Sequence, residues 1–148
     1  MSETPAAYTA QRVIKFRAWD GKRFYWFDDD HRYVLEFNKI SGWNVVPNVP
    51  DYKGNYLAGD SADVPVILEQ FTGLKDSNGI EIYEADVIEK EIEGPNGEKA
   101  LFRGAVRYWG SGFCLAIPGY GSELLYSNSR RNGCVIGSIH EHADLFPA

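Results

Sequence analysis

The chain has 148 residues, 44% of them hydrophobic and 24% charged, which fits one globular domain with a single core. Its eight Phe, nine Tyr and four Trp exclude a disordered chain, because so many large apolar side chains would have to stay in water. No run approaches the roughly 18 to 20 apolar residues of a membrane-spanning helix. The formal net charge of -6 is unlike the basic balance of most proteins that bind a phosphate backbone.

Residues 1–11 are small and polar, and we expect them to form a flexible arm. They contain no cationic region followed by an apolar one, so we expect no signal peptide. Cys114 and Cys134 form no CxxC motif and are expected to be free thiols in a reducing compartment. These features predict a cytoplasmic protein whose single domain spans residues 12–148.

The first half of this domain consists of short runs rich in β-branched and aromatic residues, separated by turn sequences. Alternation predicts a strand over residues 14–18, and Asp20-Gly21 predicts a type I′ turn into a return strand over 24–27. Further strands are expected over 32–37 and 43–46. Residues 47–63, with their Pro and Gly, are predicted to form a long mobile loop.

The second half predicts strands over 64–71, 80–83, 87–92, 100–109, 113–117 and 134–139, and one helical turn within 141–146. For residues 100–109 to keep one apolar face, Gly104 must lie flat in the strand or mark a bulge. No segment has room for the helices that join parallel strands. We therefore predict a mainly β fold with little helix: a single domain of short antiparallel strands that form a partly open barrel.

No catalytic constellation is found. The glycines beside Ser111 and Ser122 do not complete a nucleophile elbow, and Cys114 lies among apolar residues without a flanking cation. The acidic segment 81–93 alternates with isoleucines, which favours a strand with a solvated face over paired acid–base carboxylates. Phosphate-binding loops are absent as well. We predict no enzyme and no cofactor.

His140 and His142 form a local pair of metal-type ligands. In a strand, residues two apart share a face, so both imidazoles could reach one ion if His31 or an acid from residues 28–30 were the third ligand. Nothing in the sequence fixes that third ligand. We favour exposed or hydrogen-bonded histidines and predict no metal site.

Two segments interleave cations with aromatic residues, as do proteins that bind single-stranded nucleic acid. The same pattern suits a strand with an aromatic core face and a cationic outer face. The candidate binding surface drawn from them consists of Arg17, Trp19, Lys22, Arg23, Tyr25, Tyr126, Arg130 and Arg131.

Three segments, residues 14–20, 70–88 and 135–141, together resemble the YopX family of phage and prophage proteins. The last is similar to the family's closing IGNIYEN strand. The central motif, which we interpret as a folding signature before a binding site, comprises Gln70, Phe71, Thr72, Gly73, Leu74, Asp76, Asn78, Gly79, Tyr83, Glu84 and Asp86. Within it, Glu84 and Asp86 are expected to accept backbone N–H groups. The chain departs from the family pattern at Ala85, Ser138 and His140, where glycine, asparagine and tyrosine are usual.

The resemblance implies a β-rich phage or prophage accessory protein that acts in the bacterial cytoplasm, with no assigned activity. We predict a non-enzymatic binding or assembly module that self-associates, because catalytic residues are lacking while aromatic residues are abundant. The alternative is a small β-barrel that binds nucleic acid, which the net charge does not favour; an enzyme or a metal-binding protein ranks lower. The expected partner is a second copy or an unidentified host or phage protein, and not a membrane.

Overall fold

The structure is a computed structural model that describes residues 13–27, 32–38, 42–48, 53–54, 57–59, 66–110 and 112–144. Within these ranges the chain forms twelve β-strands in three antiparallel sheets and one 3-10 helix, with no α-helix. One of these sheets curls into a half-barrel, so the predicted mainly β, partly open barrel-like fold is confirmed. No helix in this part of the chain is long and apolar enough to cross a membrane. The predicted arm, residues 1–11, lies outside the described residues.

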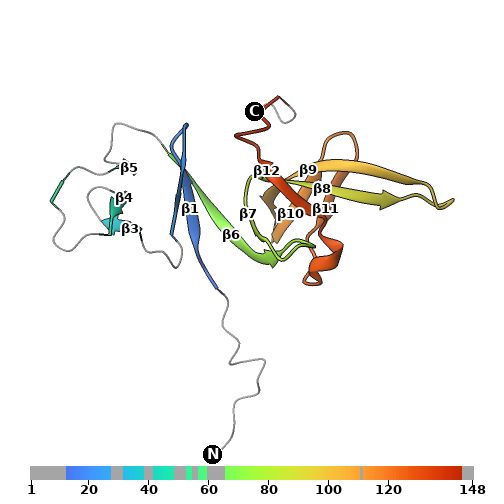
Figure 1. Cartoon of the computed structure of the whole chain (residues 1–148), viewed down its shortest axis with the longest axis horizontal. Coiled ribbons are helices and arrows are strands. Elements are labelled where there is room, and N and C mark those ends of the chain that lie inside the picture. Colours follow the sequence, from blue (N-terminus) through green and yellow to red (C-terminus); the bar gives the residue numbers. More distant parts are fainter. Residues whose placement is uncertain are drawn as a thin grey trace, which may run out of the picture.

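The first sheet has the order β2-β1-β6-β7. Its strands are β1 (Phe16–Trp19), β2 (Phe24–Trp26), β6 (Ile67–Lys75) and β7 (Glu81–Tyr83). β6 begins three residues later than predicted and continues to Lys75, because it pairs with β1 at one end and with β7 at the other. In Figure 1, β6 connects the β1–β2 hairpin to the region of strands β7 to β12.

The predicted type I′ turn between β1 and β2 is wrong. Trp19 pairs with Phe24, which leaves a four-residue loop, and Asp20 does not adopt the positive φ that the turn requires. Instead, Asp20 Oδ1 accepts hydrogen bonds from the backbone N–H groups of Lys22 and Arg23, each at 2.8 Å. The side chain of Asp20 thus holds the loop in place of a tight backbone turn.

The second sheet has the order β11-β10-β9-β8-β12. Its strands are β8 (Asp86–Glu93), β9 (Lys99–Trp109), β10 (Gly112–Ile117), β11 (Gly121–Leu124) and β12 (Cys134–Ser138). The sequence did not predict β11, which is short and mostly exposed. Gly104 lies flat in β9, since the β8–β9 register runs through it without a shift. A Cβ at Gly104 would meet Leu115 Cγ at 2.6 Å, so glycine lets β10 pack closely there.

The third sheet consists of β3 (Tyr33–Asn38), β4 (Gly42–Pro47) and β5 (Ala58–Gly59). β5 lies inside the stretch predicted to be a loop, so that prediction is wrong at these two residues. Two residues carry no alternation that a sequence pattern could show; β5 forms because Ala58 and Gly59 pair with β4. Most of the remaining stretch lies outside the described residues.

Two clusters of buried apolar side chains make the core. One, built on Ile82, Ile88 and Val106, lies within the five-stranded sheet and reaches β7. The other joins Ala18 and Tyr25 to Val45 and Ala58, and so packs the β1–β2 hairpin against the three-stranded sheet. After β11 the chain passes through the 3-10 helix η1 (Ser129–Arg131) into β12. Residues 139–144 then form turns, and the helical turn predicted within 141–146 falls partly on residues 145–148, which lie outside the described part.

Candidate functional site

A cluster of buried charges joins the four-stranded sheet to the five-stranded sheet. Arg17, on β1, is 3% exposed, and its Nε donates to Glu69 Oε1 on β6 at 2.8 Å. Its Nη1 lies 2.9 Å from Asp86 Oδ1 at the start of β8, and its Nη2 donates to the carbonyl oxygen of Glu84 at 3.0 Å. Each of the three guanidinium nitrogens therefore faces an acceptor from a different strand or turn.

His140 completes this charge cluster from the segment that follows β12. Its Nε2 lies 2.8 Å from Glu69 Oε2, so the Glu69 carboxylate is shared between a guanidinium and an imidazole. The imidazole ring also stacks on Trp19, with the ring centroids 4.6 Å apart and the planes at 10°. The carboxylate fixes the edge of the imidazole and the indole fixes its face.

Aromatic rings enclose the Arg17 guanidinium. Its Cζ lies 4.5 Å from the ring centroid of Phe24, 5.3 Å from that of Trp26 and 5.0 Å from that of Tyr83. These rings exclude water and attract the cation through their negative faces. Burial raises the pKa of Asp86 to about 6, although the Arg17 charge and the Tyr83 N–H group pull it in the other direction.

A cavity of about 290 Å³ opens beside the charge cluster, where the two sheets meet. Glu69 and His140 line it together with Glu84 from the β7–β8 turn and Arg107 from β9. Ile67, Tyr108 and Ile139 line it with apolar side chains that are exposed or half-buried. We call it the junction cavity.

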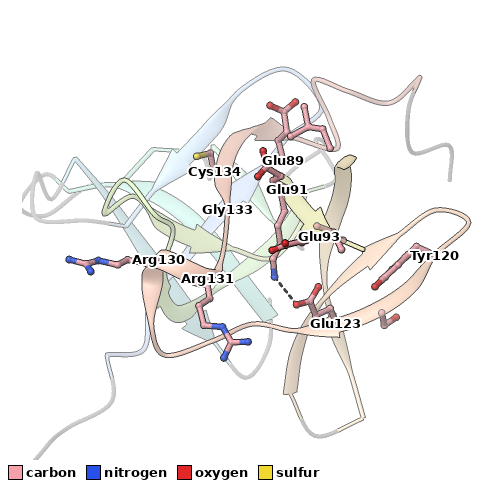
Figure 2. A pocket seen from close by; sticks show the side chains of 13 residues that line it. Glu89, Glu91, Glu93, Tyr120, Glu123, Arg130, Arg131, Gly133 and Cys134 are labelled. Carbon is pink, nitrogen blue, oxygen red and sulfur yellow. Dashed lines mark hydrogen bonds and ion pairs between the residues drawn. The ribbon is translucent and has the colours of Figure 1, made fainter. Parts of the chain in front are cut away.

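A larger groove of about 680 Å³ lies along β8, β11 and η1 and is shown in Figure 2. Lys90 Nζ lies 2.6 Å from Glu123 Oε1 within it. Although burial raises the pKa of Glu123, hydrogen bonds from Lys90 and Tyr126 hold it below its usual value, so this ion pair persists at neutral pH. The Arg131 guanidinium stacks on Tyr126 with its Cζ 3.9 Å from the ring centroid.

Apart from the Lys90–Glu123 pair, the charges around this groove are segregated. Glu89, Glu91 and Glu93 follow one another along β8, while Arg130 and Arg131 lie at the other side, on η1 (Figure 2). Glu89 pairs with Arg103 and Glu91 with Lys99, and these pairs are at least partly exposed to water. Within the described residues, Glu93 and Arg130 form no salt bridge. The groove therefore presents an acidic side and a basic side.

The YopX protein family model matches residues 15–146. This chain belongs to the YopX family. Its structure is similar to the crystal structure of protein EF1440 from Enterococcus faecalis, with a TM-score of 0.54 and 24% identity, over 91% of this chain and 99% of the other. It is also similar to the X-ray structure of yopX from Bacillus subtilis, with a TM-score of 0.61 and 16% identity, over 90% and 96% of the two chains. No curated protein matches the sequence. At such identities the structures show the shared fold alone.

The motif that carries the YopX resemblance is used for backbone contacts. Asp76 Oδ1 accepts from the N–H groups of Asn78 and Ile80, and its Oδ2 accepts from Val135 N–H, which ties β6 to β12. Thr72 Oγ1 donates to the carbonyl oxygen of Ile82. Glu84 and Asp86 both accept backbone N–H groups, from Gln70 and Tyr83 respectively.

Two departures from the YopX pattern fall at the charge cluster. Ala85 adopts a left-handed φ of 69°, the conformation that glycine favours and that the family usually fills with glycine. His140 replaces the usual tyrosine and uses its ring nitrogen to bind Glu69. Among the described residues, no group of three or more side chains could hold a metal ion. His31, residues 28–30 and Ser111 lie outside the described residues.

The structure divides the candidate binding surface into a buried part and two exposed parts. Arg17 and Tyr25 are buried, so their predicted place on a binding surface is wrong: carboxylates surround Arg17, and Tyr25 packs in the second core cluster. Trp19 is half-buried against His140. Lys22 and Arg23 remain exposed on the β1–β2 loop. Of the other three residues, Arg130 and Arg131 line the groove, and Tyr126 stacks against the Arg131 guanidinium.

Sequence reasoning did not select Glu69, the central carboxylate of the charge cluster. Its signal was present: Glu69 is a lone acid in a run of apolar residues expected to form a strand, as Arg17 is a cation in another such run. A charge on the buried face of each of two strands predicts that they pair. The alternation around Arg17 hid this signal, because it placed Arg17 on the outer face.

Proposed function

We propose that this YopX-family protein is a non-enzymatic assembly module that self-associates through the groove of β8, β11 and η1. The observation that supports this most directly is the separation of charge across the groove, with glutamates of β8 on one side and Arg130 and Arg131 on the other (Figure 2). A two-fold axis brings the same patch of each copy against the other, and so sets acidic side against basic side twice.

Exposed apolar side chains beside these charges add to the proposal. Leu101 is 62% exposed and Tyr120 56%, and both line the groove. Burying apolar area stabilises an association by about 25 cal/mol for each Å². Charge fixes the orientation of such a dimer, while these side chains supply the favourable burial.

The nucleic-acid alternative receives less support from the same surface. A groove for a nucleic-acid backbone is uniformly positive, whereas the carboxylates of β8 line this one. In the other cation-rich segment, which spans residues 17–25, Arg17 and Tyr25 are buried and not open to a ligand.

The setting that we propose is the cytoplasm of a phage-carrying bacterium. Family membership supports this, as do Cys114 and Cys134, which are free thiols in the structure.

Sedimentation velocity over a concentration series tests the self-association. We expect the wild type to form dimers, and the charge reversals R130E and R131E, made together, to weaken the dimer by at least about ten-fold. The pair E91R and E93R should do the same. Mixing these two double variants should restore association, because each basic side then meets an acidic one.

The matched control reverses Lys22 and Lys53, two exposed cations outside the groove, and should leave the dimer unchanged. A wild type that stays monomeric at every concentration overturns the proposal, and so does a mixture that fails to associate. Titration of labelled single-stranded DNA at two salt concentrations is the second readout. Binding that R130E and R131E abolish would assign the groove to nucleic acid instead.

A further inference from the structure

The junction cavity combines a rigid charged floor with aliphatic walls. Glu69 is 2% exposed and holds the His140 imidazole, which Trp19 stacks from its face. Ile67 of β6 and Ile139 of the segment after β12 supply the aliphatic side chains. Pockets of about 300 Å³ and above that are mostly apolar, with a few convergent polar groups, are the usual form of a small-molecule site.

Two charged groups of opposite sign line this cavity and keep free hydrogen-bonding capacity. Arg107 forms no salt bridge within the described residues. Glu84 uses Oε1 to accept the Gln70 N–H group at 2.9 Å, which leaves Oε2 available. They lie close in the fold because Ala85, next to Glu84, donates its N–H to the carbonyl oxygen of Val106, next to Arg107.

We infer that the junction cavity binds a free aliphatic α-amino acid. The ammonium group pairs with the Glu84 carboxylate and the carboxylate with the Arg107 guanidinium. The aliphatic side chain packs against Ile67 and Ile139. Ile67 and Tyr108, which are 54% and 58% exposed, stand where a bound ligand would cover them.

The charges of the cavity favour this class over its simpler relatives. A carboxylic acid without the amino group would offer the Glu84 carboxylate no ammonium partner. An amine without the carboxylate would offer the Arg107 guanidinium no anionic partner. Either loses a charge-assisted hydrogen bond and keeps the cost of removing a charge from water. Glu69 is not available as a second anionic group, since Arg17 and His140 engage both of its oxygens.

Calorimetric titration of the full chain with L-leucine, 4-methylpentanoic acid and 3-methylbutylamine tests this inference. We expect L-leucine to bind, and each of the other two compounds to bind at least about ten-fold more weakly. R107Q and E84Q should each weaken L-leucine binding by about ten-fold or more. E84Q keeps an acceptor for the Gln70 N–H group, so it preserves the turn. R103Q, which removes an exposed arginine from the same strand but outside the cavity, should leave binding unchanged.

Absence of heat and of ligand-induced NMR shifts with L-leucine would overturn the inference. It would also be overturned if R107Q and E84Q bound L-leucine as the wild type does, or if all three compounds bound equally. The inference does not rest on self-association, since the groove and the junction cavity share no lining residue. Performing the titration on the R130E and R131E double variant keeps the two outcomes separate.

Discussion

The carboxyl group of Asp86 lies 2.9 Å from the Arg17 guanidinium, yet burial raises its pKa from 3.8 to about 6. The folded chain therefore binds this proton more tightly than the unfolded chain does. Between pH 4 and 6 the native state carries more protons, so the free energy of unfolding that Asp86 contributes falls as the pH rises through this window. The pKa shift of Asp86 corresponds to a loss of roughly 3 kcal/mol in the free energy of unfolding across this window, at about 1.4 kcal/mol for each pKa unit.

The variant D86N tests this linkage, because its amide does not titrate. The free energy of unfolding of the wild type, minus that of D86N, should be largest near pH 4 and should fall by roughly 3 kcal/mol by pH 7. Urea denaturation at intervals of pH measures this difference and cancels the titration of all other groups. A difference that grows with pH would mean that the ion pair with Arg17 outweighs the cost of burial.

At the scale of the elements, the turn between β7 and β8 is the strained connection. Ala85 has a φ of 69° and is 5% exposed, and its backbone N–H and carbonyl groups bind Val106 and Ile139. A left-handed residue with a Cβ costs about 1 to 2 kcal/mol, while glycine gains freedom in the unfolded chain. We expect A85G to raise the free energy of unfolding by up to about 1 kcal/mol and the melting temperature by about 2 to 4 °C.

Thermal unfolding by circular dichroism measures this effect. The control is A105G, a buried alanine of β9 with an ordinary strand conformation, which should lower stability by roughly 0.5 to 1 kcal/mol. If A85G and A105G lower the melting temperature alike, the conformation of Ala85 carries no strain.

How well the sequence predicted each element depended on whether alternation and turn residues agreed. β9 and β10 were predicted to within one residue at either end, because apolar periodicity and glycine-rich turns mark the same boundaries. β5 and β11 were not predicted, since two and four residues are too short to show alternation. In the candidate site, the sequence indicated which neighbouring residues lie together but not which distant residues meet. Tyr126, Arg130 and Arg131 lie together because they are close in sequence, whereas Glu69 joins Arg17 only through the β1–β6 register.

At the scale of the whole molecule, the charge cluster connects two sheets that also share apolar packing through Ile82 of β7. Arg17 and Glu69 belong to one sheet and Asp86 to the other, and their side chains are 4%, 3% and 4% exposed. Burying a satisfied ion cluster contributes little net stability, but removing one partner leaves the others without compensation. This cluster therefore makes the folding of each sheet depend on the other.

The variant R17M should thus destabilise the protein by roughly 3 to 5 kcal/mol, because two carboxyl groups stay buried without their cation. Adding E69Q and D86N to R17M should recover most of the lost stability, because no unpaired carboxylate then stays buried. If R17M alone fails to fold, this triple variant still distinguishes the effect of the unpaired charges from an effect of poor packing. R103M, which breaks the exposed pair with Glu89, should cost less than about 1 kcal/mol.

Urea denaturation followed by tryptophan fluorescence and by far-UV circular dichroism should give coincident transitions, since the two sheets unfold together. A stability of R17M within about 1 kcal/mol of the wild type would contradict this role, and separated transitions in the wild type would show that the two sheets fold independently.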